Sequence, residues 1–248
     1  LVSMGASPHA YTMSLSLNNS VDKLWLKNFS NSLYKEQKKY NLYLMGGDIV
    51  KSKYLSITIT ILGVIDKGKY IKRNSAKIND DIWVTGNIGD SYIGHKLLKK
   101  RIIIKNINKK KYFINSYYYP NPPVALSIKL GKFMTSAIDI SDGFIGDLEK
   151  ITVNFKKGAN IFLKNIPYSN YCKFLINNKV VSVSELLCGG DDYQLLFTAK
   201  VKNRPYLYKL SSKYKIKFSR VGKITKSKKL NLLGYNITSL KKSYKHFI

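Results

Sequence analysis

The sequence predicts a mixed α/β (α+β) protein built in two lobes. Segments in which apolar and polar residues alternate are typical of half-buried strands. They are interspersed with segments whose apolar residues recur every three or four positions, as in amphipathic helices. The 248 residues suffice for one large domain or two modest ones, and 44% of them are hydrophobic, enough for a substantial core. We expect the first lobe to span residues 1–75 and the second residues 76–248.

The first lobe is predicted to contain a strand, a helix and a second strand. Strict alternation predicts strands over 11–17 and 54–62. Ser20 is expected to cap the intervening helix. One face of that helix carries Val21, Leu24, Trp25, Phe29 and Leu33.

The second lobe is predicted to mix shorter strands with helices. Strands are expected over 82–85, 137–140, 161–163, 193–199 and 218–221. Helices are expected over 90–99 and 141–153. Residues 101–119 are rich in Lys, Asn and Tyr, and we interpret them as a surface segment that Pro120 ends.

The net charge of +29, from 43 basic and 14 acidic residues, raises the question of a polyanionic partner. Only four of the bases are arginine, the side chain suited to bidentate phosphate and base contacts, and the lysines are spread along the chain. We interpret the charge mostly as a property of solvated faces and expect no specific nucleic-acid partner. A basic protein that binds RNA or a membrane surface stays an alternative, which strongly salt-dependent RNA binding would favour.

Simple patterns exclude several classes of protein. No apolar run approaches the roughly 20 residues of a membrane span. Cys172 and Cys188 are too few for a disulfide scaffold or a four-cysteine zinc site. No signal peptide is recognisable, so we expect a cytoplasmic protein without a membrane partner. The chain opens on Leu1 rather than Met, and we interpret it as a piece of a longer protein.

The few carboxylates are distributed in an informative way. Five of the 14 fall in three short glycine-bearing motifs, Gly46-Gly47-Asp48, Asp139 to Gly143, and Gly189 to Asp192. Each motif follows an apolar run, so each acid is expected where an element ends and a loop or helix begins. Ligand sites of layered α/β proteins tend to lie at such ends.

Asp139 and Asp142 are the strongest candidates for a metal site. They stand three residues apart at a predicted strand-to-helix junction, with the Ser141 hydroxyl between them and the first amides of the helix nearby. Such oxygens suit Mg²⁺ bridged to phosphate, because Mg²⁺ takes few protein ligands and shares substrate oxygens. The structural alternative is an Asp N-cap followed by a first-turn acid. For the other two motifs the alternative is a hairpin turn, but three together favour one shared metal–phosphate site.

Seven motifs in order along the chain resemble one known family. They are M-G-A-S-P-H-A near the start, L-M-G-G-D at 44–48, K-R-N-S-A-K at 72–77, W-V-T-G-N-I-G-D at 83–90, Y-P-N-P at 119–122, A-I-D-I-S-D-G-F-I-G-D-L at 137–148 and C-G-G-D-D-Y-Q-L-L-F-T at 188–198. Together they resemble the thiamine-monophosphate kinases, members of the aminoimidazole ribonucleotide synthetase-like superfamily. The resemblance spans nearly the whole chain.

The resemblance implies a two-lobed aminoimidazole ribonucleotide synthetase-like fold, here with an incomplete N-terminal ATP- and metal-binding lobe, in a homodimer. It implies transfer of the γ-phosphoryl group of ATP to thiamine monophosphate with several Mg²⁺ ions and no catalytic residue of the protein. By motif, the implied ATP contacts are Gly47, Asp48, Arg73 and Ser141, and the implied metal ligands are Asp48, Asp139 and Asp142. The implied substrate contacts are Asp191 and Tyr244.

The chain also departs from the family pattern. Ile49-Val50-Lys51 replaces a Thr-Thr-Arg run, Pro123 stands in place of an arginine, and Ser30 stands where an aromatic residue is common. Further metal ligands of the family would precede Leu1, so we expect this fragment alone to be inactive. Two other interpretations stay open, a non-catalytic remnant that binds nucleotide and another member of the same superfamily.

Overall fold

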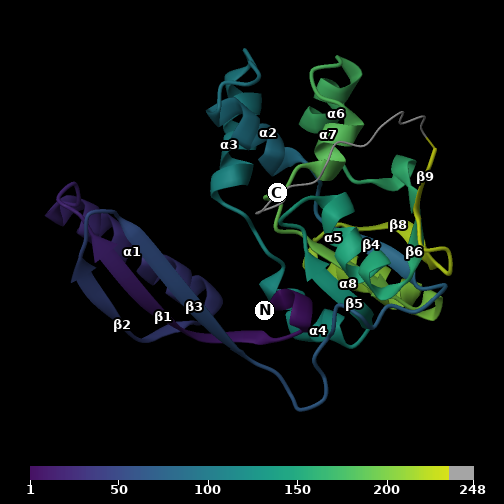
Figure 1. The fold of residues 1–248 in the computed structure, drawn as a ribbon, viewed down its shortest axis with the longest axis horizontal. Helices are drawn as coiled ribbons and strands as arrows, with labels where there is room; N and C mark the ends of the chain where they lie inside the picture. The colour runs from purple at the N-terminus through teal and green to yellow at the C-terminus, as the bar shows by residue number, and fades with distance from the viewer. Residues whose placement is uncertain (235–248) are drawn as a thin grey trace. The chain divides into compact units, whose positions relative to one another are not determined.

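The computed structural model describes residues 1–234, which form two compact units (Figure 1). The first unit consists of Gly5–Tyr70 with Leu1, and the second of Val2–Met4 and residues 71–234. Each unit combines a sheet with helices. This arrangement confirms the predicted mixed α/β class.

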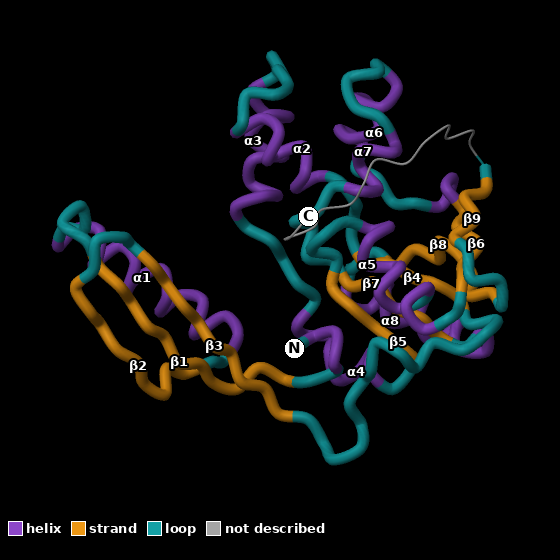
Figure 2. Tube along the Cα trace, viewed as in Figure 1, coloured by secondary structure: helices purple, strands orange, loops and turns teal. Residues whose placement is uncertain are grey.

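The first unit is a three-stranded sheet with one long helix (Figure 2). Its elements are β1 (Ser7–Leu17), α1 (Lys23–Tyr40), β2 (Tyr43–Lys51) and β3 (Ser56–Val64). The strand order is β2-β1-β3, in which β1 pairs parallel with β2 and antiparallel with β3. A parallel pair needs a crossover connection, and α1 provides it between β1 and β2.

The helix α1 begins later than the sequence predicted. Its N-cap is Asp22, whose carboxylate accepts a hydrogen bond from the Trp25 amide at 2.6 Å, so the expected cap at Ser20 was wrong. An ionised carboxylate at the N-cap is a stronger acceptor than a hydroxyl and also favours the positive end of the helix dipole. Ser20 instead bonds to Asn18 in the preceding turn.

The two outer strands of this sheet are exposed along their whole lengths. Every residue of β2 and of β3 is exposed, including Ile57, Ile59 and Ile61 at 40–49%. On the central strand β1, in contrast, Tyr11 and Leu15 are buried. An outer strand carries unpaired N–H and C=O groups, so apolar, exposed outer strands are a natural place for further strand or subunit contacts.

The second unit is organised around a six-stranded sheet of order β5-β7-β4-β8-β6-β9. Its strands are β4 (Asp81–Thr85), β5 (Met134–Asp139), β6 (Gly158–Phe162), β7 (Leu195–Ala199), β8 (Phe218–Thr225) and β9 (Leu230–Leu233). All neighbouring pairs are antiparallel except β6 and β9. The five strands predicted for this lobe are confirmed, while β9 was not predicted.

Both faces of this sheet are covered. Ile82, Val84 and Leu196 belong to one hydrophobic cluster, whereas Trp83 and Phe197, which alternate with them, belong to a second. Because successive residues of a strand point to opposite faces, the two clusters lie on opposite sides of the sheet. The sheet is therefore a middle layer, which explains why β4 and β7 are buried at every position.

Within residues 1–234, six longer helices accompany the sheet. They are α2 (Asp90–Leu98), α3 (Ile107–Tyr118), α5 (Phe144–Ile151), α6 (Asn170–Asn177), α7 (Val183–Cys188) and α8 (Arg204–Tyr214), with the single-turn α4 (Ser127–Gly131). The segment 101–119, interpreted from its composition as a surface segment, is mostly exposed or half-buried, but it also forms the helix α3, which was not predicted and which buries Phe113 completely. Within residues 1–234, no helix is both long and apolar enough to cross a membrane.

Candidate active site

The candidate site begins at the end of β5. This strand ends at the half-buried Asp139, which pairs with Leu195 of β7, and a loop of four residues leads into α5. The helix starts at Phe144 rather than at Ser141 as predicted. Gly143 has a φ of +108°, a backbone conformation that other residues rarely adopt, so it separates the loop from the helix. Asp139, Ser141 and Asp142 therefore lie together at the strand end.

A second loop runs alongside the first and is hydrogen-bonded to it. The amide of Asp191 donates to the Ser141 carbonyl at 3.0 Å, and the amide of Tyr193 donates to the Ile140 carbonyl at 2.8 Å. In the other direction, the Ile140 amide donates to the Gln194 carbonyl at 2.8 Å. Two of the three acidic motifs are thus brought together, and Asp191 lies beside Ser141.

Two glycines permit this close approach. A Cβ atom on Gly190 would lie 2.0 Å from the Ser141 carbonyl oxygen, and one on Gly143 would lie 2.6 Å from the carbonyl group of Cys188. Both distances are far below van der Waals contact, and both obstacles are backbone atoms. The glycines of these motifs therefore serve loop packing, which is a structural reason for their presence. We refer below to segments 139–143 and 189–194 as the paired loops.

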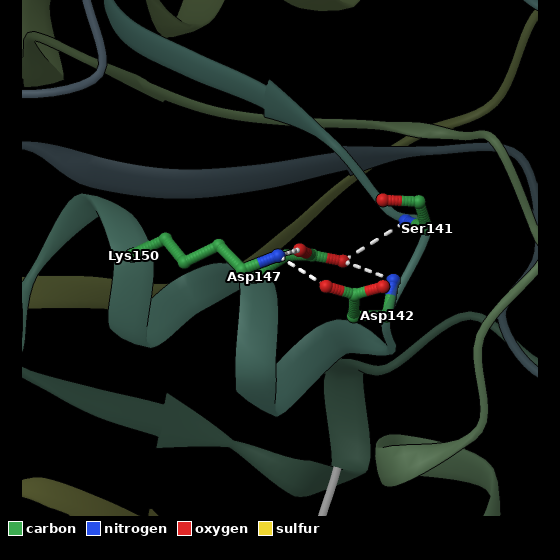
Figure 3. A network of polar contacts seen from close by, with 4 residues as sticks. All are labelled: Ser141, Asp142, Asp147 and Lys150. Carbon is green, nitrogen blue, oxygen red and sulfur yellow. Dashed lines mark hydrogen bonds and ion pairs between the residues drawn. The ribbon is translucent and has the colours of Figure 1, made fainter. Parts of the chain in front are cut away.

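Asp147 of α5 holds the first of the paired loops (Figure 3). Its Oδ2 accepts hydrogen bonds from the amides of Ser141 and Asp142, each at 2.9 Å. These two amides stand where the predicted helix would have offered its first amides to a ligand, but both are engaged by Asp147. Burial raises the pKa of Asp147, while the hydrogen bonds from Lys150 and from the Asp142 amide oppose the rise.

Lys150 follows Asp147 by one helical turn and contacts two carboxylates (Figure 3). Its Nζ lies 2.5 Å from Asp142 Oδ2 and 2.7 Å from Asp147 Oδ1. Partial burial lowers the pKa of Lys150, but the two carboxylates outweigh this effect and raise it overall. Sequence reasoning assigned no role to Asp147 or Lys150, although an acid and a base three residues apart after the D-I-S-D-G motif was a visible signal.

Tyr193 is another residue that sequence reasoning missed. Its hydroxyl lies 3.5 Å from Asp191 Oδ1, and its side chain is 40% exposed. Burial raises the pKa of the phenol, and the charges of Asp191 and Asp139 raise it further. The backbone of Tyr193 has a φ of +48°, which is uncommon for a bulky residue. An aromatic ring is thus held near two of the predicted site acids.

Asp192 has a structural role despite its place in the same motif. It is buried, and its carboxylate accepts hydrogen bonds from the amides of Gly89 at 2.7 Å and Ser91 at 3.3 Å at the start of α2. Burial raises the pKa of Asp192 well above its usual range. The neighbouring acid Asp90 accepts hydrogen bonds from the hydroxyls of Tyr112 and Ser169. The two hydrogen bonds of Asp192 thus tie the second of the paired loops to the start of α2.

The third acidic motif lies inside a strand of the first unit. Gly47 and Asp48 belong to β2, so the prediction that Asp48 stands at the end of an element was wrong. Gly47 is required there because a Cβ atom would lie 1.8 Å from the Met13 carbonyl oxygen. Asp48 pairs with Ser14, which pairs with Thr58 on its other side, so an exposed carboxylate shares one sheet face with two hydroxyls.

The two remaining predicted contacts are Arg73 and Tyr244. Arg73 lies exposed in a turn, and its carbonyl accepts a 2.7 Å hydrogen bond from the hydroxyl of Ser136 on β5. Within residues 1–234 its guanidinium has no ion-pair or hydrogen-bond partner. The backbone of Arg73 is thus fixed beside the strand that ends at Asp139, while its charged group stays available. Tyr244 lies outside the described residues.

The oxygen donors of the paired loops fit a cation of the Mg²⁺ type. Asp139 and Asp142 provide carboxylates and Ser141 a hydroxyl, all hard donors on one short segment. In the described part of the chain, no group of three or more His, Cys, Asp or Glu side chains forms a metal cage. Mg²⁺ does not need one, because it commonly binds one or two carboxylates and completes its shell with water and phosphate oxygens.

Comparison with known proteins first defines the class. Residues 1–65 match the family described as AIR synthase related protein, N-terminal domain. The fold superposes on the crystal structure of thiamine-monophosphate kinase from Stenotrophomonas maltophilia with a TM-score of 0.84 at 26% identity, over 96% of this chain and 75% of that chain. A structure described as AaThiL complexed with AMPPCP and TMP gives 0.84 at 22% identity, over 99% and 76% of the two chains.

A curated relative then specifies the family. The chain is 39% identical to the thiamine-monophosphate kinase of Buchnera aphidicola subsp. Acyrthosiphon pisum (strain APS), over 100% of this chain and 76% of that protein. The chain therefore belongs to the thiamine-monophosphate kinase family, which confirms the resemblance drawn from its motifs.

Proposed function

We propose that the chain carries out the phosphoryl transfer after which its relatives are named. In this proposal the γ-phosphoryl group of ATP passes directly to thiamine monophosphate, giving thiamine diphosphate and ADP, in the cytoplasm. The observation that carries the proposal is the pairing of the two loops, which places Asp139, Ser141 and Asp142 beside Asp191 and Tyr193. The structural neighbour complexed with AMPPCP and TMP supports the choice of ligands.

Transfer between two phosphates requires alignment and charge neutralisation rather than a protein nucleophile. Asp139 and Asp142 would hold Mg²⁺ ions. Asp48, which the resemblance implies as a metal ligand, is proposed as one separately. When bound, these ions would neutralise phosphate oxygens as charge develops. The protein's own part is to hold donors at fixed positions, and the Asp147 bonds to the Ser141 and Asp142 amides do this for the first of the paired loops.

The remaining residues are assigned to the two substrates, ATP and thiamine monophosphate. Arg73, whose guanidinium has no partner within residues 1–234, provides a planar fork that suits phosphate oxygens of ATP. Ser141 and Gly47 are further ATP contacts in this proposal. Asp191, together with the ring of Tyr193, provides a negative charge and an aromatic face suited to the cationic ring of thiamine. Tyr244 is proposed as a second aromatic contact.

The metal assignment is tested by nucleotide binding. Calorimetry with AMPPCP and Mg²⁺ should show binding that needs Mg²⁺ and weakens by about tenfold or more in Asp139→Asn or Asp142→Asn. Asp66→Asn is the matched control, because Asp66 is exposed and pairs with Lys69 on the surface of the first unit. Binding that ignores Mg²⁺, or that is equally strong in all three variants, would refute the assignment.

Turnover is tested separately with ATP, Mg²⁺ and thiamine monophosphate. The product to measure is thiamine diphosphate, in the 248-residue chain and, as a reference, in the full-length Buchnera relative, of which this chain spans 76%. We expect the chain to turn over far more slowly than the reference, because the resemblance implies metal ligands in addition to those of this chain. Nucleotide binding with no turnover by the chain would favour a non-catalytic remnant.

A homodimer is part of the proposal. The strands β2 and β3, exposed at every position, offer apolar side chains to a second copy. Light scattering should give twice the monomer mass. A stable monomer over a wide concentration range would contradict the dimer and leave the phosphoryl transfer untouched.

A further inference from the structure

Two carboxylates and one ammonium group form a compact cluster at the start of α5 (Figure 3). We call Asp142, Asp147 and Lys150 the lysine cluster. Lys150 is the only cation within it, and it contacts both acids at 2.5 Å and 2.7 Å. The three side chains carry one net negative charge, so the cluster can accept further positive charge.

The two acids of the lysine cluster differ in how many carboxylate oxygens remain available to a ligand. Asp147 is fully buried, and both of its oxygens are engaged, Oδ2 by two amides and Oδ1 by Lys150. Asp142 is 19% exposed, and within residues 1–234 only its Oδ2 has a hydrogen-bond partner, which is Lys150. A ligand cation can therefore approach Asp142 but not Asp147.

Lys150 is placed to leave one acid without leaving the other. Its side chain is 34% exposed and reaches the cluster by a flexible stem of four methylene groups. It stands three residues after Asp147 on α5, so the contact between these two lies along one helix face. The contact with Asp142 instead spans from the helix to the loop.

We propose that Lys150 is a built-in counter-cation that holds Asp142 in place when no divalent cation is bound and competes with that cation for the carboxylate. The inference rests on the proposed function, which assigns a divalent cation to Asp142. The positive charge of Lys150 repels a free divalent cation. A cation that arrives bound to a polyphosphate brings negative charge with it, which Lys150 attracts. Lys150 is thus a positioning residue that favours the metal–nucleotide complex over the bare metal ion.

The test is a titration of the 248-residue chain with Mn²⁺ alone, with free Mn²⁺ measured by electron paramagnetic resonance. Lys150→Gln removes the charge but keeps a donor for Asp147, and it should bind Mn²⁺ about tenfold more tightly. Lys150→Arg keeps the charge and should stay within about threefold of the parent chain. The gain from Lys150→Gln should be smaller for Mn²⁺ added with AMPPCP. Circular dichroism checks the fold, and Lys150→Met serves as a second neutral variant.

A double-variant cycle shows whether the effect passes through Asp142. In the Asp142→Asn background, Lys150→Gln should no longer change Mn²⁺ affinity. Unchanged or weaker Mn²⁺ binding in both neutral variants overturns the inference while the metal assignment stands. Parent binding that Asp142→Asn does not weaken overturns the metal assignment itself, so the two failures are distinguishable.

Discussion

Replacing Gly190 with alanine should push the paired loops apart. The added Cβ atom would lie 2.0 Å from the Ser141 carbonyl oxygen, whereas ordinary contact begins at 3.4 Å, so one loop must move by about 1.4 Å. Such a shift breaks the 3.0 Å hydrogen bond from the Asp191 amide to Ser141 and weakens the neighbouring one from Tyr193. With about 1 kcal/mol for each bond and a similar strain, the free energy of unfolding should fall by about 2–3 kcal/mol.

The functional consequence should exceed the loss of stability. Misplacing a binding group by about 1 Å commonly costs on the order of 100-fold in rate, and binding of Mg²⁺–AMPPCP should weaken by at least about tenfold. Urea unfolding followed by circular dichroism measures stability, and calorimetry measures nucleotide binding. Both are measured on the same preparation.

Gly94→Ala is the matched control. A Cβ atom there would lie 2.1 Å from the Phe113 carbonyl oxygen, so the clash with backbone is nearly identical, but it lies between α2 and α3. This variant should lose similar stability, less the roughly 1 kcal/mol by which alanine favours a helix over glycine. It should bind nucleotide like the parent chain. Equal nucleotide binding by both variants would refute the argument that the paired loops form the site.

Two further predictions concern buried groups of the second unit. Burial raises the pKa of Asp192 in the folded chain above its usual 3.8. The stability that protonated Asp192 contributes is therefore fully present below pH 3.8 and is lost as the pH rises through the raised pKa. Urea unfolding across pH should therefore show that Asp192→Asn flattens this fall, and a parallel pH dependence of variant and parent would contradict it. Cys172 and Cys188 are buried, and burial raises the pKa of the Cys172 thiol, so neither should react with a thiol reagent until urea unfolds the chain. Rapid labelling of the native protein would show that this core opens.

Local patterns predicted the strands whose side chains alternate. The expected strands 11–17 and 54–62 correspond to β1 (Ser7–Leu17) and β3 (Ser56–Val64). The period of two comes from the pleat itself and therefore appears in the sequence before any partner strand is known. The helix from Phe144 was predicted for a similar reason, although its start was placed three residues too early.

Elements that depend on a partner were missed or misread. The glycines of β2 suggested a turn, but they lie within a strand because the backbone of β1 passes close beside Gly47. The segment that forms α3 has a composition typical of a surface, yet its Phe113 is completely buried. Propensity is a weak guide where tertiary packing supplies the stabilisation.

The sequence by itself determined the family, the mixed fold class and the acidic motifs that contribute to the candidate site. It did not distinguish acids that hold the structure from acids that face a ligand, because residue type and spacing are the same for both. Asp191 and Asp192 are adjacent, yet one lies beside Ser141 in the second loop while the other is buried against the start of α2. Only the tertiary structure decided this, since burial and the available N–H donors depend on segments about 50 and 100 residues away in the chain.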